Sequence, residues 1–224
     1  MGTTKHLHDP TLEELVDVTI QGISTAQKDY KQAWQSHVFN SAYCPEYLMK
    51  VYIFQSLLRL RRKCGSPYGL SLEEPVRTII DHLPTTRGRY PGKLRLGGKC
   101  DLVFWEEKEE EKPLVAIEVK EDITDHRADI GRLAALVQRN LRLGIFASCK
   151  AQQVRAKRED AEAELLQTTD SMCKDIQRCL SKEDRSLRLT YKLGNTKKLR
   201  LEGDEESLVW CPACLLISKK RSRR

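Results

Sequence analysis

Apolar residues in the first third of the chain recur with the period of an α-helix. Thr11 and Glu14 have the spacing of a capping box, in which each side chain satisfies a free backbone N–H group of the first helical turn. A second helix is predicted from Pro45, because proline suits the first turn of a helix. A third is predicted to begin at Ser71, with Glu74 as its capping-box partner and apolar residues on one face. The first hundred residues are therefore expected to be mainly helical.

The middle of the chain changes to a strand pattern. Residues 100–105 and 114–120 are short apolar runs typical of buried strands, and an acidic stretch joins them. A helical period follows over 130–141, and residues 144–149 form another apolar run. A strand, a helix of this length and a strand predict a parallel pair with a right-handed crossover. We therefore expect an α/β fold with a central mixed β-sheet flanked by helices.

The last third of the chain predicts a long charged helix followed by β-structure. The helix is expected over about 150–180, and strands are expected over 186–193, 198–201 and 208–217. No linker stands out, so the parts are expected to form one domain. These parts are an N-terminal helical extension (1–40), a core (41–150), a C-terminal helix and β-hairpin extension packed on the core (151–218), and a basic tail (219–224).

Composition indicates a folded, rather polar protein. Of the 224 residues 40% are hydrophobic, and Lys+Arg 39 against Asp+Glu 32 give a net charge of +7. Such a composition excludes a disordered chain. Five positive charges lie in the last six residues, so the rest of the chain is close to neutral. We expect no membrane span, no secretion signal and reduced cysteines, and hence a cytoplasmic protein.

Two charged residues interrupt the apolar strand 114–120. Alternation puts Glu118 and Lys120 on one face of this strand, although both faces are otherwise apolar. Burial of such charges costs several kcal/mol unless they are paired or bind a metal. The alternative is an exposed hairpin in which a Glu and a Lys pair across the strands, but the apolar flanks argue against it.

The preceding strand supplies a second acid. If the two strands form a hairpin that pairs Trp105 with Leu114, then Asp101 lies opposite Glu118. Two facing carboxylates repel each other, so a cation is expected between them. A hard divalent ion such as Mg²⁺ accepts carboxylate oxygens and leaves positions for water and phosphate oxygens. This spacing therefore predicts a magnesium site at the end of the hairpin.

At these residues the sequence resembles the PD-(D/E)xK nuclease superfamily, which has the restriction-endonuclease-like fold. The matching elements are Asp101 in the first strand, Glu118-Val119-Lys120 in the second, and the helix and strand that follow. Cys100 stands where the family name has proline. The resemblance covers about 101–149 well and 41–100 less closely, so it implies a nuclease-like core over 41–150.

The resemblance implies a metal-dependent endonuclease that hydrolyses phosphodiester bonds, with DNA as the expected substrate. Its expected context is restriction, phage defence, a mobile element or repair. Asp101, Glu118 and the carbonyl of Val119 are expected to bind Mg²⁺, for which Mn²⁺ can substitute. Lys120 is expected to orient or activate the attacking water and to offset charge on the phosphate. A homodimer or a partner protein for target selection is also expected.

The family often adds an acid from an early helix. Glu46 is favoured here over Glu74, because the predicted capping box already gives Glu74 a role. Glu46 has an ordinary alternative role as well, since an acid in the first turn complements the helix dipole. Arg132 and Gln138 of the following helix are further candidates to approach the site, and a solvated helix face is the alternative explanation for both.

A basic segment without acidic residues precedes Asp101. Its cations can neutralise phosphates, so the segment is expected to bind nucleic acid, with a solvated loop as an equally ordinary alternative. The expected nucleic-acid-binding residues are Arg87, Arg89, Lys93, Arg95 and Lys99.

Two other function classes compete with a nuclease. One is a catalytically silent nucleic-acid-binding or assembly module with the same fold. The other is a zinc-stabilised regulatory protein, because Cys211 and Cys214 have the spacing of a zinc knuckle. A structural zinc site needs four ligands and the chain has no second such pair, so buried thiols are the simpler expectation.

Overall fold

The fold is seen in a computed structural model of the chain. It describes residues 9–33, 44–64, 68–84, 97–106, 111–124, 127–200 and 205–220.

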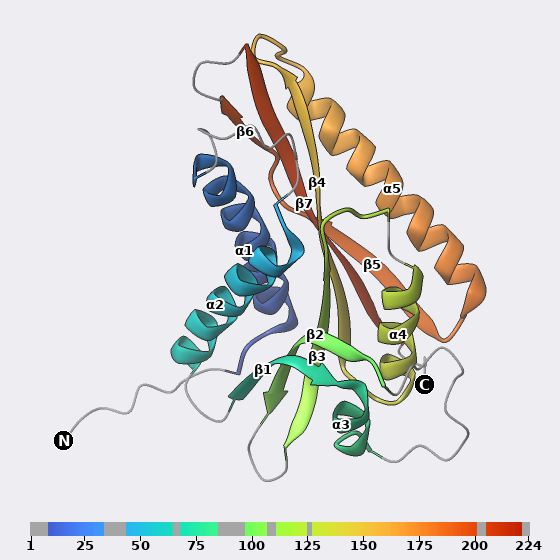
Figure 1. The fold of residues 1–224 in the computed structure, drawn as a ribbon. Coiled ribbons are helices and arrows are strands. Elements are labelled where there is room, and N and C mark those ends of the chain that lie inside the picture. Colours follow the sequence, from blue (N-terminus) through green and yellow to red (C-terminus); the bar gives the residue numbers. More distant parts are fainter. Residues whose placement is uncertain are drawn as a thin grey trace, which may run out of the picture.

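A mixed seven-stranded β-sheet forms the centre of the fold (Figure 1). The strand order is β1-β2-β3-β4-β7-β5, and β6 also pairs with β7. β3 and β4 pair in parallel, as the sequence predicts, and the other described neighbours are antiparallel. The strands are β1 (Tyr68–Pro75), β2 (Lys99–Glu106), β3 (Lys112–Lys120), β4 (Leu143–Arg155), β5 (Leu187–Leu193), β6 (Lys197–Arg200) and β7 (Glu206–Lys219).

Helices cover both faces of this sheet (Figure 1). α1 (Leu12–Ala33) and α2 (Glu46–Cys64) pack on one face through a large apolar cluster. α3 (Val76–Asp81), α4 (Arg127–Gln138) and α5 (Ala161–Glu183) pack on the other face. The expected α/β class with a mixed, helix-flanked sheet is confirmed. Among the helices of the described ranges, none combines the length and apolar composition needed to cross a bilayer.

Local sequence signals place the first two helices correctly. The Glu14 N–H donates to Thr11 Oγ1 at 3.1 Å, and the Thr11 N–H donates to Glu14 Oε2 at 2.8 Å. The predicted capping box therefore exists and starts α1. α2 begins directly after Pro45, as the preference of proline for a first turn predicts.

The helix predicted from Ser71 is wrong, because this segment is strand β1. It pairs with β2 at seven positions, and the Trp105 indole N–H donates to Ser71 Oγ at 2.8 Å. The backbone hydrogen bonds and burial gained along the sheet outweigh the local capping pattern. Glu74 consequently lies in the strand, and the helix begins only at Val76, after Pro75.

The helix predicted over 150–180 begins too early. β4 continues to Arg155 because it pairs with β7 as far as Glu206, and α5 begins at Ala161. Charged and polar residues in this second half of β4 resemble a solvated helix in sequence. The predicted strands at the C-terminal end agree with β5, β6 and β7 to within a few residues.

Gly22 sets how closely α1 approaches α2, so Gly22→Ala is expected to destabilise the fold. A Cβ at this position would lie 2.7 Å from Ile53 Cα and 2.9 Å from Ile53 N, so the helices must separate. Alanine gains about 1 kcal/mol in helix propensity, but overpacking against backbone costs more. We expect the free energy of unfolding, measured with urea, to fall by about 1–2 kcal/mol net.

Gly97→Ala is the matched control for this substitution. A Cβ there meets nothing within 4 Å, so its effect should stay within about 0.5 kcal/mol. A Gly22→Ala protein as stable as the Gly97→Ala protein would contradict the close approach of the two helices.

Candidate functional site

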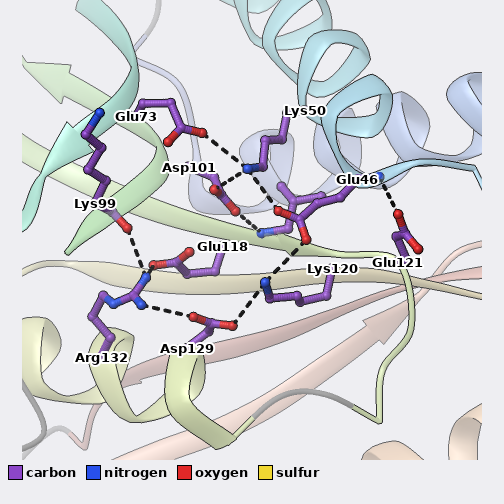
Figure 2. A network of polar contacts seen from close by, with 11 residues as sticks. Glu46, Lys50, Glu73, Lys99, Asp101, Glu118, Lys120, Glu121, Asp129 and Arg132 are labelled. Atoms are coloured by element: carbon purple, nitrogen blue, oxygen red, sulfur yellow. Dashed lines mark hydrogen bonds and ion pairs between the residues drawn. The ribbon is translucent and has the colours of Figure 1, made fainter. Parts of the chain in front are cut away.

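Charged side chains from four elements meet where β3 ends (Figure 2). α2 and α4 reach this point from opposite faces of the sheet, and β2 and β3 form its floor. The structure thus brings together the four residues selected from the sequence as catalytic, although they lie in three separate elements. We call the following seven residues the site cluster: Glu46, Lys50, Asp101, Glu118, Lys120, Asp129 and Arg132.

The register of β2 and β3 differs from the prediction at one end only. Trp105 pairs with Pro113 and not with Leu114, because an irregularity shifts the register between residues 104 and 105. Beyond the shift, Leu102 pairs with Ile117, which is the predicted inner register. If this register continues by one residue, Asp101 lies opposite Glu118.

The alternation of β2 breaks at Asp101, so the two acids are approached from different helix layers. Cys100 and Leu102 would share a face in a regular strand, but Leu102 packs on the α1/α2 side and Cys100 on the α4 side. In β1, Leu72 pairs with Leu102 and Glu74 pairs with Cys100. Glu73 lies between them and has a φ of 52°, which is a costly conformation for a residue other than glycine. Asp101 therefore contacts Lys50 of α2 and Glu118 contacts Arg132 of α4, while the two carboxylates stay close enough for Asp101 to raise the pKa of Glu118.

Each of these buried acids has a cation of its own. Lys50 Nζ lies 2.6 Å from Asp101 Oδ1, while Asp101 Oδ2 accepts the Val119 N–H at 2.7 Å. Arg132 donates to Glu118 from α4. The predicted need for positive charge is thus met by two side chains, one from each helix layer.

Glu46 and Lys120 link the two helix layers. Lys120 Nζ lies 3.3 Å from Glu46 Oε2 in α2 and 3.6 Å from Asp129 Oδ2 in α4. The other oxygen of Glu46 lies 2.9 Å from Lys50 Nζ. Glu121 Oε1 accepts the backbone N–H of Glu46 at 3.1 Å and so supplies an acceptor at the start of α2. The Glu46 carboxylate therefore contacts the site cluster directly, whatever it adds to the helix dipole.

Burial dominates the titration of the two strand acids. It raises the pKa of Glu118 from 4.5 to about 8, against the opposing charge of Arg132 and with a further rise from Asp101. Burial also raises the pKa of Asp101, although Lys50 and the Val119 N–H oppose the rise. Both shifts mean that the resident cations do not fully offset the cost of burying the two carboxylates.

The donor types of the site fit a hard divalent cation. Together with Glu73, which lies 3.2 Å from Lys50, the site cluster has five carboxylates and three cations, a net charge of −2 when all are ionised. Carboxylate oxygens and a main-chain carbonyl are ligands that Mg²⁺ accepts. Within the described ranges, no three His, Cys, Asp or Glu side chains are already grouped as metal ligands. An ion at Asp101 and Glu118 must therefore compete with Lys50 and Arg132 for the same oxygens.

The other residues selected from the sequence have mixed outcomes. Lys99 is exposed, and its carbonyl accepts the Arg132 N–H at 2.9 Å, so it lies at the site. Arg132 is a member of the site cluster, whereas Gln138 donates to Asp184 instead. Glu74 pairs with β2 and makes no described contact with the cluster. The remaining basic residues, Arg87, Arg89, Lys93 and Arg95, lie outside the described residues.

Cys211 and Cys214 do not form a zinc knuckle. Both lie in β7, and residues three apart on a strand point to opposite faces of the sheet. Cys211 packs with α5 residues, and Cys214 packs in the cluster under α1 and α2. Burial raises the pKa of Cys211 to about 11 and that of Cys214 further. One zinc ion therefore cannot bind both sulfurs in this fold.

Sequence reasoning missed three of the charged groups at the site. Lys50 follows Glu46 by one helical turn and Asp129 precedes Arg132 by three residues, so helical spacing around the selected residues is a usable signal. Glu73 had no such signal, because its position depends on the strand conformation of β1.

Comparison with known proteins adds no assignment. No protein-family model, no curated protein and no solved structure matches the chain. The geometry and charge of the site cluster are therefore the basis for assigning a function.

The raised pKa of Glu118 predicts a pH-dependent stability. The folded protein holds this proton more tightly than the unfolded chain, so stability falls as pH rises from about 4.5 to about 8. Glu118→Gln cannot ionise and escapes this loss. In EDTA, the free energy of unfolding of Glu118→Gln relative to wild type should rise by on the order of 3 kcal/mol between pH 5 and pH 9. A difference that stays constant with pH would contradict the shift.

Proposed function

We propose that the protein is a metal-dependent nuclease that hydrolyses phosphodiester bonds, with DNA as substrate and Mg²⁺ or Mn²⁺ as cofactor. The observation that carries the proposal is the convergence of Glu46, Asp101, Glu118 and Lys120 at one end of the sheet. Glu46 and Lys120 lie 74 residues apart in the chain, so local sequence does not bring them together. These are the residues that the resemblance to the PD-(D/E)xK superfamily selects.

The order of elements around the site also supports the proposal. β2, an acidic connection, β3, α4 and a parallel β4 follow one another as the resemblance implies. We therefore propose a restriction-endonuclease-like core over 41–150, with 1–40 and 151–218 as extensions. A cytoplasmic location and a homodimer or partner protein for target selection belong to the same proposal.

The metal would be held by Asp101, Glu118 and the carbonyl of Val119. When bound, such an ion lowers the pKa of a water molecule and stabilises charge that develops on a phosphate. The protein contributes a buried position for the two carboxylates, which are 8% and 2% exposed. Water has little access there, so electrostatic interactions with the ion are stronger than at the surface.

Lys120 would act as a cation and hydrogen-bond donor. Burial lowers its pKa, but the carboxylates of Asp129 and Glu46 outweigh this effect and the net shift is upward. The ammonium group therefore stays protonated near neutral pH and is not a proton acceptor. This favours a role in orienting the attacking water and in offsetting charge on the phosphate. Glu46, 3.3 Å away, positions this ammonium group.

A specific observation favours a second candidate, the catalytically silent nucleic-acid-binding or assembly module. Asp101 and Glu118 already have counter-charges in Lys50, at 2.6 Å, and Arg132. The network is thus connected without any metal, and the charges serve to hold α2 and α4 on the sheet. The two candidates differ in whether an ion can displace these side chains.

Cleavage assays test the nuclease directly. Asp101→Asn and Lys120→Ala should lower metal-dependent cutting of plasmid, linear or single-stranded DNA by about 100-fold or more, because each removes a group that acts on the reacting phosphate or its metal. EDTA should abolish cutting by wild type. Glu46→Gln should also lose activity, whereas Glu74→Gln, at the other acid considered from the sequence, should retain it. Absence of cutting with Mg²⁺ and Mn²⁺ on all three substrates would favour the silent module.

Metal binding tests the competition with Lys50. Lys50→Met removes one of the two cations that hold the strand acids, so Mn²⁺ should bind about tenfold more tightly by isothermal titration calorimetry. Lys150→Met is the matched control, because Lys150 pairs with Asp122 at 3.0 Å outside the site cluster. Equal Mn²⁺ affinity in all three proteins would contradict the competition, and no binding in any of them would count against the metal site itself.

A further inference from the structure

The outward face of α2 leads away from the site cluster as a continuous exposed surface. Met49, Ile53 and Leu57 pack inward on the opposite side of the helix. At 3.6 residues per turn, the exposed residues occupy one sector of the helix surface. We call this sector the α2 outer face; its residues are Tyr47, Val51, Gln55, Arg59, Arg62 and Lys63.

The α2 outer face is cationic toward its C-terminal end. α2 has five Lys and Arg residues and a single Glu, a net charge of +4. Arg59, Arg62 and Lys63 are exposed, and no acid in the described ranges pairs with them. Interaction with the helix dipole accounts for cations in the last turn, but it decays within that turn and does not account for Arg59. These cations are thus available to an anionic partner.

The opposite end of the α2 outer face is apolar and adjoins the site. Tyr47 is 68% exposed and directly follows Glu46, and Val51 is 43% exposed one turn along. Leu72 of β1, 45% exposed, lies beside this end, where Lys50 contacts Glu73. Three of the four most exposed large apolar side chains in the described ranges therefore gather next to the site cluster. Surfaces that bind single-stranded nucleic acid combine exposed aromatic rings, on which bases stack, with cations that contact phosphates.

We propose that the α2 outer face binds a single-stranded segment of nucleic acid. A base stacks on Tyr47, and phosphates farther along the strand contact Arg59, Arg62 and Lys63. The helix spans about 22 Å between Tyr47 and Arg62, enough for several nucleotides. The inference rests on the proposed function, because the strand has to pass from this face to the site cluster. It names the substrate class as nucleic acid with unpaired bases next to the cleaved phosphate, since a base inside a duplex offers no free face.

Binding in EDTA tests this surface without cleavage. The full chain is titrated into a labelled single-stranded DNA and into a duplex of the same sequence, and fluorescence anisotropy is measured over a range of salt concentrations. Tyr47→Ala should weaken single-strand binding by about 5- to 100-fold, the range for loss of one stacked base, and change duplex binding less than about twofold. Tyr47→Phe keeps the ring and should bind like wild type.

The cations have a separate readout. The double substitution Arg59→Gln and Arg62→Gln should lower the slope of log affinity against log salt for single-stranded DNA by about 1.4, since each lost phosphate contact contributes about 0.7. Arg188→Gln, at an exposed arginine of β5, is the matched control and should leave the slope unchanged. Circular dichroism spectra of all variants serve as the check that each protein is folded.

The outcomes separate this inference from the nuclease proposal. Equal weakening of single-strand and duplex binding by Tyr47→Ala would overturn the stacking site, and an unchanged salt slope in the double variant would overturn the phosphate track. A protein that cuts DNA but binds normally in all α2 variants contradicts this inference alone. A protein that binds single strands through α2 but cuts nothing supports the surface and contradicts the nuclease.

Discussion

Burial of two carboxylates at the ends of adjacent strands is the constraint on which the rest of the site depends. Asp101 and Glu118 lie in a sheet that is apolar on both faces, so neither acid can rely on water to solvate its charge. The protein places a lysine from one helix layer and an arginine from the other beside them. Every other charged group at the site contacts one of these two cations or Lys120.

The same constraint lets a structural role and the proposed catalytic role use the same residues. Buried charges need partners for the fold to be stable, and reactive groups need low solvent access for strong electrostatic interaction. The three cations meet the first need, and the excess of carboxylates would favour a divalent ion that meets the second. A nuclease requires that a divalent ion can displace Lys50 and Arg132 from the two acids, whereas an assembly module does not.

The sequence predicted the site more fully than the surrounding elements. Glu118, Lys120 and Asp101 stand out in the sequence because charged residues are unusual in an apolar strand, and Glu46, which is favoured there over Glu74, contacts Lys120. The helix at Ser71 and the early start of α5 were wrong, because long-range strand pairing outweighs local capping and charge patterns. The direction of Asp101 was not predictable, since it depends on a break in alternation that pairing rules do not contain.

The break in the alternation of β2 at Asp101 has a consequence for the two helix layers. At this level Asp101 of β2 contacts Lys50 of α2, and Lys120 of the neighbouring β3 contacts an acid from each helix layer. Movement of α2 relative to the sheet therefore alters the field felt by α4, and the reverse holds as well. The two helix layers, which a sheet normally keeps apart, are therefore joined by charged side chains at the end of β3.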